Sequence, residues 1–476
     1  METKIKPQNK TSIKEIEQAF KTLKENQLEV GNTTYIERKA KLNLLHKAVL
    51  KYRNEIKDAM YKDYRKHPSE VDLTEVYPVV SEIKHAKKRL RNWIGNHSIS
   101  TPFALLGSSS YIKYEPKGVV LIISPWNFPF NLTLGPLVGA IAAGNCVMVK
   151  PSEHTPHSSE LIKKIISEVF STSEVSVIEG GIEESQAILE QPFNHIFFTG
   201  APSVGKIVMS AAAKNLTSVT LELGGKSPTI IDETANIEAA ARRVAWGKFL
   251  NNGQVCIAPD YVLVHANKKD EFLNTVKKYI KKFYSENAEQ ETSYSRIVNK
   301  KHFTRVKEYI EDAVEKGSQI DIGGELNSNQ NYISPTVICN VPEDSKLMNN
   351  EIFGPVMPVF TFNNLDEVIH KINNREKPLA LYIFSKSSKN VKKILNNTRA
   401  GGGCINHSAV HFFNNNLPFG GSNNSGIGKA HGFEGFKSFS NPRGILKQHI
   451  PNALELLFPP YNNFKQQIID ILVKYL

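Results

Sequence analysis

The chain has 476 residues and a mass of 53.3 kDa, which is too long for one compact core and predicts two or three domains. Its apolar fraction of 40% and charged fraction of 22% are those of an ordinary globular protein and exclude disorder as the default. The net charge of +12 raises the question of nucleic-acid binding, but the lysines are scattered over helical segments without any nucleic-acid motif. We therefore expect no nucleic-acid partner.

The four cysteines, Cys146, Cys256, Cys339 and Cys404, are widely spaced and form no CxxC pair. This spacing argues against a disulfide framework and against a structural zinc site, so we expect no metal. The first thirty residues are polar and charged, and nowhere do eighteen apolar residues follow one another. The sequence therefore predicts a cytoplasmic protein without an integral membrane segment.

The first hundred residues have a helical pattern, with apolar residues at helical spacing, for example Ile13, Ile16, Phe20 and Leu23. From Gly118 the pattern changes to short β-branched runs separated by helical stretches. These runs read VVLIIS, NCVMVKPS, SVIEGG and HIFFTG. Such alternation is typical of a parallel α/β sheet.

A second set of strand patterns, VTLELGG, SPTIID and YVLVH, starts a second α/β domain near residue 223. We predict two doubly wound parallel α/β domains. Residues 1–100 and 115–222 would form a dinucleotide-binding domain, and residues 223–436 a catalytic domain. The strand-prone segments 101–114 and 437–450 would form a small β arm outside both domains.

The end of the chain, residues 451–476, predicts a C-terminal helix. One helical face carries five apolar side chains, those of Phe464, Ile468, Ile469, Leu472 and Leu476. The helix is too short to span a bilayer. We expect it to pack against the body of its own subunit, in preference to anchoring the protein at a membrane surface.

Cys256, in NNGQVCIAPD, follows a glycine turn that would project its thiol into a cleft. A lone cysteine is more often a small buried apolar residue, so its neighbours must decide its role. Glu222 ends a β-branched run just before two glycines, where the backbone can approach a ligand closely. It is a candidate general base. The alternative is a strand-end glutamate satisfied by backbone amides or by a lysine.

The loop PWNFP, residues 125–129, follows the VVLIIS strand at the edge where open α/β sheets bind ligands. Two prolines make the loop rigid, and Asn127 between them has an amide N–H that can donate to a developing oxyanion. The alternative is an asparagine that caps a turn.

Two further strand ends suggest a nucleotide site. Lys150 and Glu153, in VKPSE, are placed to hydrogen-bond the ribose of an adenosine. In FTGAPSVGK, Gly200 and Gly205 bracket a turn into a helix whose N-terminus would face a pyrophosphate. This pattern is not the GxGxxG fingerprint, so by spacing alone an ordinary glycine turn remains an alternative.

The chain contains, in this order, the motifs PWNFP, KPSE, FTGxxxVGK, LELGGKSP, GQVC, EIFGPV and LPFGG. Together and in this order they resemble the aldehyde dehydrogenase superfamily, and the resemblance covers essentially the whole chain. GQVCIAPDY and HGFEGFKSFS are most similar to its class 3 branch. The resemblance implies oxidation of medium or long aliphatic or aromatic aldehydes to carboxylic acids. It also implies NAD as cofactor, with NADP as an alternative, and a homodimer built partly from the arm.

Carried over position by position, the resemblance makes Cys256 the nucleophile, Glu222 the general base and Asn127 an oxyanion donor beside the Cys256 backbone N–H. It assigns cofactor binding to nine positions, namely Trp126, Lys150, Ser152, Glu153, Gly200, Ser203, Gly224, Glu351 and Phe353. Val255, where threonine is common, and SNNSG after LPFGG depart from the family pattern near the acyl pocket.

The expected reaction passes through a thiohemiacetal and a thioester on Cys256, which water activated by Glu222 then hydrolyses. Acyl transfer to coenzyme A is an alternative that needs no such base. A non-catalytic binding protein on the same fold would be expected to lose the thiol or the carboxylate. A cysteine hydrolase using His302 or His411 would leave EIFGPV and KPSE unexplained.

Overall fold

A computed structural model describes residues 10–450 and 453–475. Helices form the first part of the chain, as predicted, and two of them begin with reciprocal caps: Ser12 with Glu15, and Thr34 with Glu37. The helices of this part are α1 (Ile13–Gly31), α2 (Tyr35–Lys51), α3 (Arg53–Tyr64), α4 (Pro68–Val71) and α5 (Tyr77–Trp93). A short π-helix, Asp72–Val76, joins α4 to α5.

The first sheet has six strands in the order β17-β7-β6-β3-β4-β5, all parallel except β17. Its strands are β3 (Val119–Ile123), β4 (Cys146–Lys150), β5 (Val175–Val177), β6 (His195–Thr199), β7 (Ser218–Glu222) and β17 (Gly426–Ile427). The chain starts in the middle at β3, moves outward to β5 and then returns to β6 on the other side. The direction of winding therefore reverses between β3 and β6, which is where such sheets bind ligands.

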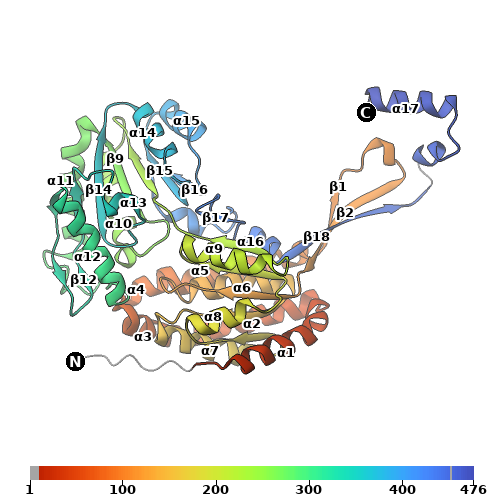
Figure 1. The fold of residues 1–476 in the computed structure, drawn as a ribbon, viewed down its shortest axis with the longest axis horizontal. Coiled ribbons are helices and arrows are strands. Elements are labelled where there is room, and N and C mark those ends of the chain that lie inside the picture. Colours follow the sequence, from red (N-terminus) through yellow and green to blue (C-terminus); the bar gives the residue numbers. More distant parts are fainter. Residues whose placement is uncertain (1–9, 451–452, 476) are drawn as a thin grey trace.

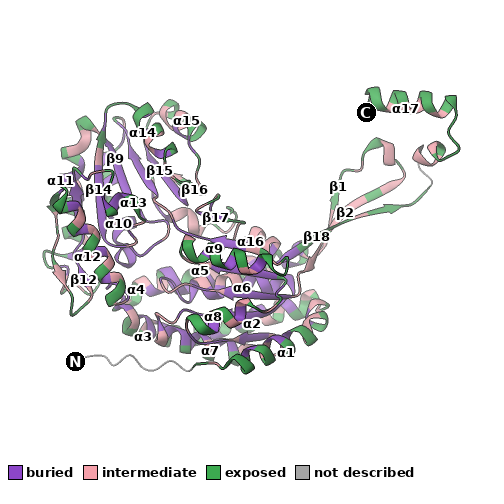
Figure 2. Ribbon diagram, in the orientation of Figure 1, coloured by how far each residue is buried: buried purple, intermediate pink, exposed green. Residues whose placement is uncertain are grey.

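Helices cover both faces of the first sheet (Figures 1 and 2). Alternate strand residues pack either against α2, α3, α5, α6 and α7 or against α1, α8 and α9. The helices between these strands are α6 (Asn131–Ala143), α7 (Pro156–Val169), α8 (Ile182–Leu189) and α9 (Pro202–Ala213). Because both faces are covered, β3 (VVLII) is apolar at every position and β4 is apolar up to Lys150, which explains their continuous apolar runs.

The second sheet has seven strands in the order β10-β13-β14-β9-β8-β15-β16, with only β10 antiparallel. Its strands are β8 (Pro228–Ile231), β9 (Tyr261–His265), β10 (Gln319–Ile322), β13 (Thr336–Cys339), β14 (Val356–Phe362), β15 (Ala380–Phe384) and β16 (Gly402–Ile405). Its helices are α10 (Ile237–Phe249), α11 (Lys269–Tyr284), α12 (Lys300–Glu315), α13 (Lys346–Asn349), α14 (Leu365–Asn373) and α15 (Ser388–Asn397). A small hairpin, β11 (Leu326–Asn327) and β12 (Tyr332–Ile333), lies beside it. The α/β fold class with two parallel sheets is confirmed.

A three-stranded antiparallel sheet forms an arm that projects from the body (Figure 1). Its strands are β1 (Asn96–Ile99), β2 (Ser108–Pro116) and β18 (Ser440–Gln448). The arm thus begins before the predicted segment 101–114, because β1 pairs with β2 through Asn96 to Ile99. The second segment pairs along the whole of β2.

Two elements near the end of the chain return to the first sheet. Strand β17 pairs with β7, and helix α16 (Gly432–Ser438) packs against α5 and α6. The predicted division placed residues up to 436 with the second sheet. Domain boundaries drawn from the sequence miss this return. Strand β17 has two residues and α16 has seven, which is too short for a strand or helix pattern to be recognised.

The C-terminal helix α17 (Asn463–Tyr475) does not pack against the body of its own subunit, so that prediction is wrong. No described residue of the helix is buried, and Phe464 is 68% and Val473 82% exposed. The reason is the arm: β18 carries the chain outward, and α17 lies beyond the tip of the arm (Figure 1). Leu476, part of the predicted apolar face, lies outside the described residues.

Candidate active site

The loop that presents Cys256 starts with a tight left-handed turn after α10. Asn251, Asn252 and Gly253 have φ angles of 50°, 57° and 72°. Asparagine and glycine are the residues that tolerate this backbone region. A Cβ on Gly253 would lie 2.2 Å from the Gly354 carbonyl oxygen, so the turn packs directly against the EIFGPV loop.

Gln254 holds this loop in place from inside the protein. Its side chain is fully buried, and its amide donates to the carbonyls of Asn251 (3.0 Å) and Arg296 (3.1 Å). Its carbonyl oxygen accepts from the backbone N–H of Val298 at 3.0 Å. A satisfied buried amide of this kind fixes one backbone geometry, so the thiol two residues later has a defined position.

Cys256 lies where three cavities meet. One of about 410 Å³ lies at the ends of β3 and β6. Two of about 50 Å³ each lie between α5, α6 and the loop 409–419, and one of these two also reaches the first sheet at Phe197 and Thr199. Burial raises the pKa of the Cys256 thiol, and the carboxylates of Glu351 and Glu222 raise it further. The backbone N–H groups of Cys256 and Ile257 point at the sulfur and act in the opposite direction. These surroundings favour the protonated thiol over the thiolate.

Glu222 ends β7 and is 5% exposed. It lines the large cavity and one of the small ones together with Cys256. Neither carboxyl oxygen has a hydrogen-bond partner among the described residues. Burial raises its pKa well above the usual value, with the charge of Lys429 opposing. This is not the backbone-satisfied strand end considered as the alternative, because an unpartnered buried carboxyl group is free to accept a proton.

Asn127 is buried and lines the large cavity with Cys256 and Glu222. Its amide donates to the Gln254 carbonyl at 3.1 Å, and its own backbone carbonyl accepts from the Asn251 side chain at 2.9 Å. Asn127 therefore ties the PWNFP loop to the cysteine loop. An amide has two N–H groups, and no described residue accepts from the second.

Six of the nine expected cofactor residues line the large cavity: Trp126, Gly200, Ser203, Gly224, Glu351 and Phe353. The cavity lies at the switch point of the first sheet, beyond the ends of β3 and β6. Helix α9 begins there with no side-chain cap at Ala201. Pro202 has no N–H and Val204 donates to the Ala201 carbonyl, so the backbone N–H of Ser203 is the group of the first turn that remains available to an anion. The backbone is close at Gly224, where a Cβ would lie 2.1 Å from a Glu351 carboxyl oxygen. These features suit a dinucleotide.

The other three expected residues, Lys150, Ser152 and Glu153, are not part of that lining. Lys150 pairs with Ile123 across the two neighbouring strands, so this group follows β4 at the same edge of the sheet. The Lys150 ammonium donates to Glu153 at 3.0 Å and to the Pro151 carbonyl at 3.0 Å. This ion pair lowers the pKa of Glu153, against the effect of burial.

Three cavity residues come from helix α12 and were not identified from the sequence: His302, Arg305 and Tyr309. Arg305 donates to the carbonyls of Ile352 (2.8 Å) and Phe353 (3.1 Å), so it holds the EIFGPV loop at the cavity. These residues lie on one face of an amphipathic helix. Only tertiary packing turns that face toward the cavity, and no local motif shows it.

The histidines considered for a cysteine hydrolase have other surroundings. The imidazole of His302 packs on Trp126, with ring centroids 4.7 Å apart, and burial lowers its pKa to about 3. His411 contacts a different cysteine, with its Nδ1 3.4 Å from Cys404 Sγ. Neither histidine is hydrogen-bonded to Cys256, so the structure gives that alternative no support.

The two small cavities are lined mainly by apolar side chains from α5, α6, α10 and the loop 409–419. Aromatic residues predominate around the second one, with Phe128, Trp246, Phe412 and Phe413. The first sheet has a cavity at its switch point, next to a half-buried cysteine and an unpartnered carboxyl group. This arrangement suits a dinucleotide-dependent oxidoreductase that uses a cysteine.

The comparisons give the family. A profile of the "Aldehyde dehydrogenase family" matches residues 2–445. The 4,4'-diaponeurosporen-aldehyde dehydrogenase of Staphylococcus aureus is 44% identical over 424 residues, 89% of this chain and 92% of that protein. The mouse "Aldehyde dehydrogenase, dimeric NADP-preferring" is 43% identical over 85% of this chain and 89% of its own.

A solved structure, the substrate-bound state of Staphylococcus aureus AldH, superposes with a TM-score of 0.92 at 42% identity, covering 96% of this chain and 99% of that one. The chain therefore belongs to the aldehyde dehydrogenase family. It is an NAD(P)-dependent enzyme that oxidises aldehydes. The resemblance to the class 3 branch is confirmed, since members of aldehyde dehydrogenase family 3 are among its relatives.

Proposed function

We propose that this enzyme converts apolar aldehydes to carboxylic acids with Cys256 as nucleophile and Glu222 as the base that activates water. One observation carries the proposal. Cys256 and Glu222 line the same two cavities, one on the cofactor side and one on the apolar side, and both carboxyl oxygens of Glu222 are unpartnered.

The first step is addition of the Cys256 sulfur to the aldehyde carbonyl. The thiol must lose its proton, and Glu222 is the acceptor that shares its cavities. The carbonyl oxygen becomes an oxyanion. It is stabilised by the second N–H of the Asn127 amide and by the backbone N–H of Cys256.

The cofactor, when bound, accepts the hydride that leaves the tetrahedral carbon. The chain's own contribution is to hold that cofactor at the switch point. The proposed binding residues are Trp126, Lys150, Ser152, Glu153, Gly200, Ser203, Gly224, Glu351 and Phe353. Glu153 would repel a 2′-phosphate, and its partner Lys150 would attract one, so we propose NAD with NADP as an alternative.

The second half of the reaction frees the acid. Glu222 first releases the thiol's proton to solvent and is again a carboxylate. It then takes a proton from water, the resulting hydroxide adds to the thioester carbonyl, and the Cys256 sulfur leaves with the proton of Glu222 returned to it. Transfer of the acyl group to coenzyme A would not need this carboxylate. Glu222 therefore favours hydrolysis, and its presence together with Cys256 disfavours a non-catalytic protein.

The substrate is proposed to be a medium or long aliphatic or an aromatic aldehyde. Phe128, Leu132, Trp246, Phe412 and Phe413 line the small cavities, and they offer an apolar chain or ring contact surface with few polar groups to satisfy.

We also propose a homodimer built through the arm. Strand β18 forms one edge of the arm and β16 one edge of the second sheet, so each has a row of backbone groups with no strand beside it. Pairing β18 of one subunit with β16 of the other would satisfy both edges. The mouse relative is named dimeric, which supports the proposal.

Within each subunit we propose a cofactor-binding domain around the first sheet, including β17 and α16, and a catalytic domain around the second. Among the described residues no helix is long and apolar enough to cross a membrane. A cytoplasmic location remains part of the proposal.

The test is rapid mixing of the Glu222→Gln variant with NAD and aldehyde. We expect a burst approaching one NADH per active site, then a very slow steady state with the acyl group trapped on Cys256, seen by intact-protein mass spectrometry. Help from Glu222 in deprotonating the thiol would slow the burst but leave the adduct. Steady turnover at the wild-type rate without an adduct, or far better rescue by coenzyme A than by water, would overturn the assignment.

A further inference from the structure

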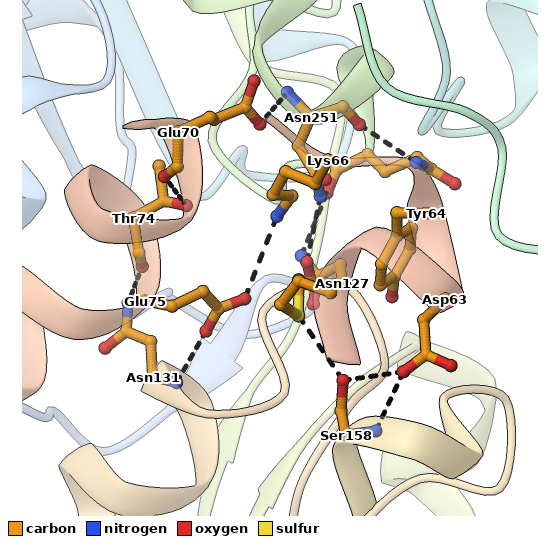
Figure 3. Close-up of polar contacts among 12 residues, drawn as sticks. Asp63, Tyr64, Lys66, Glu70, Thr74, Glu75, Asn127, Asn131, Ser158 and Asn251 are labelled. Atoms are coloured by element: carbon orange, nitrogen blue, oxygen red, sulfur yellow. Dashed lines mark hydrogen bonds and ion pairs between the residues drawn. The ribbon is translucent and has the colours of Figure 1, made fainter. Parts of the chain in front are cut away.

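A buried pair of charges lies behind the catalytic loops, and the proposed mechanism does not use it. Lys66 and Glu75 are both fully buried, with the Lys66 Nζ 3.8 Å from a Glu75 carboxyl oxygen (Figure 3). Neither of these two atoms has a hydrogen-bond partner among the described residues. Burying an ion pair costs much of what its attraction returns, so stability alone gives little reason for such a pair.

The pair contacts the PWNFP loop on the C-terminal side of Asn127. The Lys66 ammonium lies 4.6 Å from the centre of the Phe128 ring, within the range of a cation–π contact. The second carboxyl oxygen of Glu75 accepts from the backbone N–H of Asn131 at 2.8 Å. Glu75 lies in the π-helix Asp72–Val76, a rare backbone geometry, and its carboxylate reaches the start of α6, directly after the loop.

Tyr64, two residues before Lys66, holds the PWNFP loop on the N-terminal side of Asn127. It also contacts Arg296, in the stretch before α12. The Tyr64 hydroxyl donates to the Trp126 carbonyl, one residue before Asn127. The Tyr64 carbonyl accepts from the backbone N–H of Arg296 at 2.9 Å, and Arg296 in turn accepts from Gln254 of the cysteine loop.

A second carboxylate reaches the cysteine loop directly. Glu70 accepts from the backbone N–H of Asn251 at 3.0 Å, and the Asn251 side chain donates to the Asn127 carbonyl at 2.9 Å (Figure 3). Burial raises the pKa of both Glu70 and Glu75, that of Glu75 to about 7, and the charge of Lys66 opposes this rise at both. Lys66 is thus the shared counter-charge of two carboxylates, one at the cysteine loop and one at the start of α6 beside the PWNFP loop.

We propose that Lys66 is a positioning residue that fixes Asn127 relative to Cys256. It contacts Phe128 of the PWNFP loop directly, and its charge holds Glu75 at the start of α6 and Glu70 at the cysteine loop. This inference rests on the proposed role of Asn127 as oxyanion donor. Lys66 touches neither cavity that the cofactor or the apolar substrate would occupy. Its proposed effect on the rate of hydride transfer passes through Asn127.

The test is a double-mutant cycle of Lys66→Met with Asn127→Ala, read as the single-turnover burst rate of NADH formation. Lys66→Met alone should lower the burst rate by about 10- to 100-fold, because the donor moves from where the oxyanion forms. NADH affinity, measured by fluorescence titration, should stay within about threefold. In the Asn127→Ala background the further loss should be less than about threefold, because the group through which Lys66 acts is already gone.

Lys41→Met is the matched control, since it removes a partly buried lysine paired with Glu174 elsewhere in the same subunit. The control should keep the wild-type burst rate. Should Lys66→Met fail to fold, the near-isosteric Glu75→Gln goes through the same cycle, with the same direction of effect expected.

Three results would overturn the inference. Losses that multiply in the double variant would show that Lys66 does not act through Asn127, while the proposed function stands. An equal loss in the Lys41→Met control would show a general effect on stability. A normal burst in Asn127→Ala alone would remove the oxyanion donor itself, and then both the proposed role of Asn127 and the role of Lys66 fall.

Discussion

On the cofactor side of Cys256 the cavity measures about 410 Å³ and is lined by strand ends, loop backbone and the face of α12, whereas the two pockets on the other side measure about 50 Å³ each and are lined by apolar side chains. The first side is set by sheet topology, because parallel strands end at one edge. The second depends on side chains from several helices. Substrate preference can therefore change without any change in the chemistry. The variants below test whether the two sides of Cys256 act independently.

Cys256→Ser should have the largest effect, because Cys256 lines all three cavities and supplies the proposed nucleophile. Dehydrogenase activity should be abolished, since a hydroxyl is a far weaker nucleophile at neutral pH. NADH binding should stay within a few fold by fluorescence titration. Turnover near the wild-type rate would remove Cys256 as the nucleophile.

Asn127→Ala should lower the burst rate by roughly 10² to 10³, the range for loss of one oxyanion donor. Because Asn127 stabilises charge that develops in the reaction, NAD affinity should change little. A burst rate equal to that of the wild type would show that Asn127 does not stabilise the oxyanion. Its role would then be to connect the PWNFP loop with the cysteine loop.

The pH dependence of steady-state turnover should report Glu222, which serves the hydrolytic half. Its pKa is raised by burial, and the base works only when deprotonated. The rate should therefore fall about tenfold per pH unit below that raised pKa and level off above it. The fall in rate at low pH should be absent in the Glu222→Gln variant, whose slow residual turnover is measured across the same pH range. A fall that persists in this variant would belong to another titrating group.

Arg305→Ala should affect only the cofactor side. It removes the charged donor that holds the carbonyls of Ile352 and Phe353, and the KM for NAD should rise by about tenfold, or ~1.4 kcal/mol. The KM for aldehyde should stay within about twofold. An equal rise in both would mean that the two sides are not independent.

Phe413→Ala should have the smallest effect and only on the apolar side. Removing this ring should raise the KM of a long-chain aldehyde by about fivefold, because each buried methylene contributes about 0.8 kcal/mol. A short aldehyde should be affected less than twofold. A panel across chain lengths would show this, and a uniform change would place Phe413 outside the substrate path.

The sequence predicts the features that local patterns determine, and it misses those that depend on the packing of distant segments. The strand runs around Val119 and His195, and the loops that follow them, are local patterns, so the α/β class and most cavity residues were accessible. The return of β17 to the first sheet was not, because Gly426 and Ile427 pair through backbone with Glu222 and Leu221, and that contact spans about 200 residues. Nor could the environment of Lys66 be read, since a buried lysine and an exposed one look alike in a sequence.

The expected packing of α17 failed for a related reason. An apolar helical face predicts that something covers it, but not what. In this molecule the chain reaches α17 only after following the arm outward, so the body is out of reach.

The late return of the chain also bears on how the protein is made. Strand β18 completes the arm on β2, and β17 and α16 complete the first sheet, yet these three elements are synthesised some 200 to 350 residues after their partners. A nascent chain leaving the ribosome must therefore keep the flank of its first-formed half open until residues 426–448 have been made. Such long-range closure is slow, and it exposes strand edges during synthesis. A ribosome stalled near residue 420 would hold a cofactor domain that has its five parallel strands and the glycine turn after β6. That domain would still lack β17 and α16, the helix that covers α6.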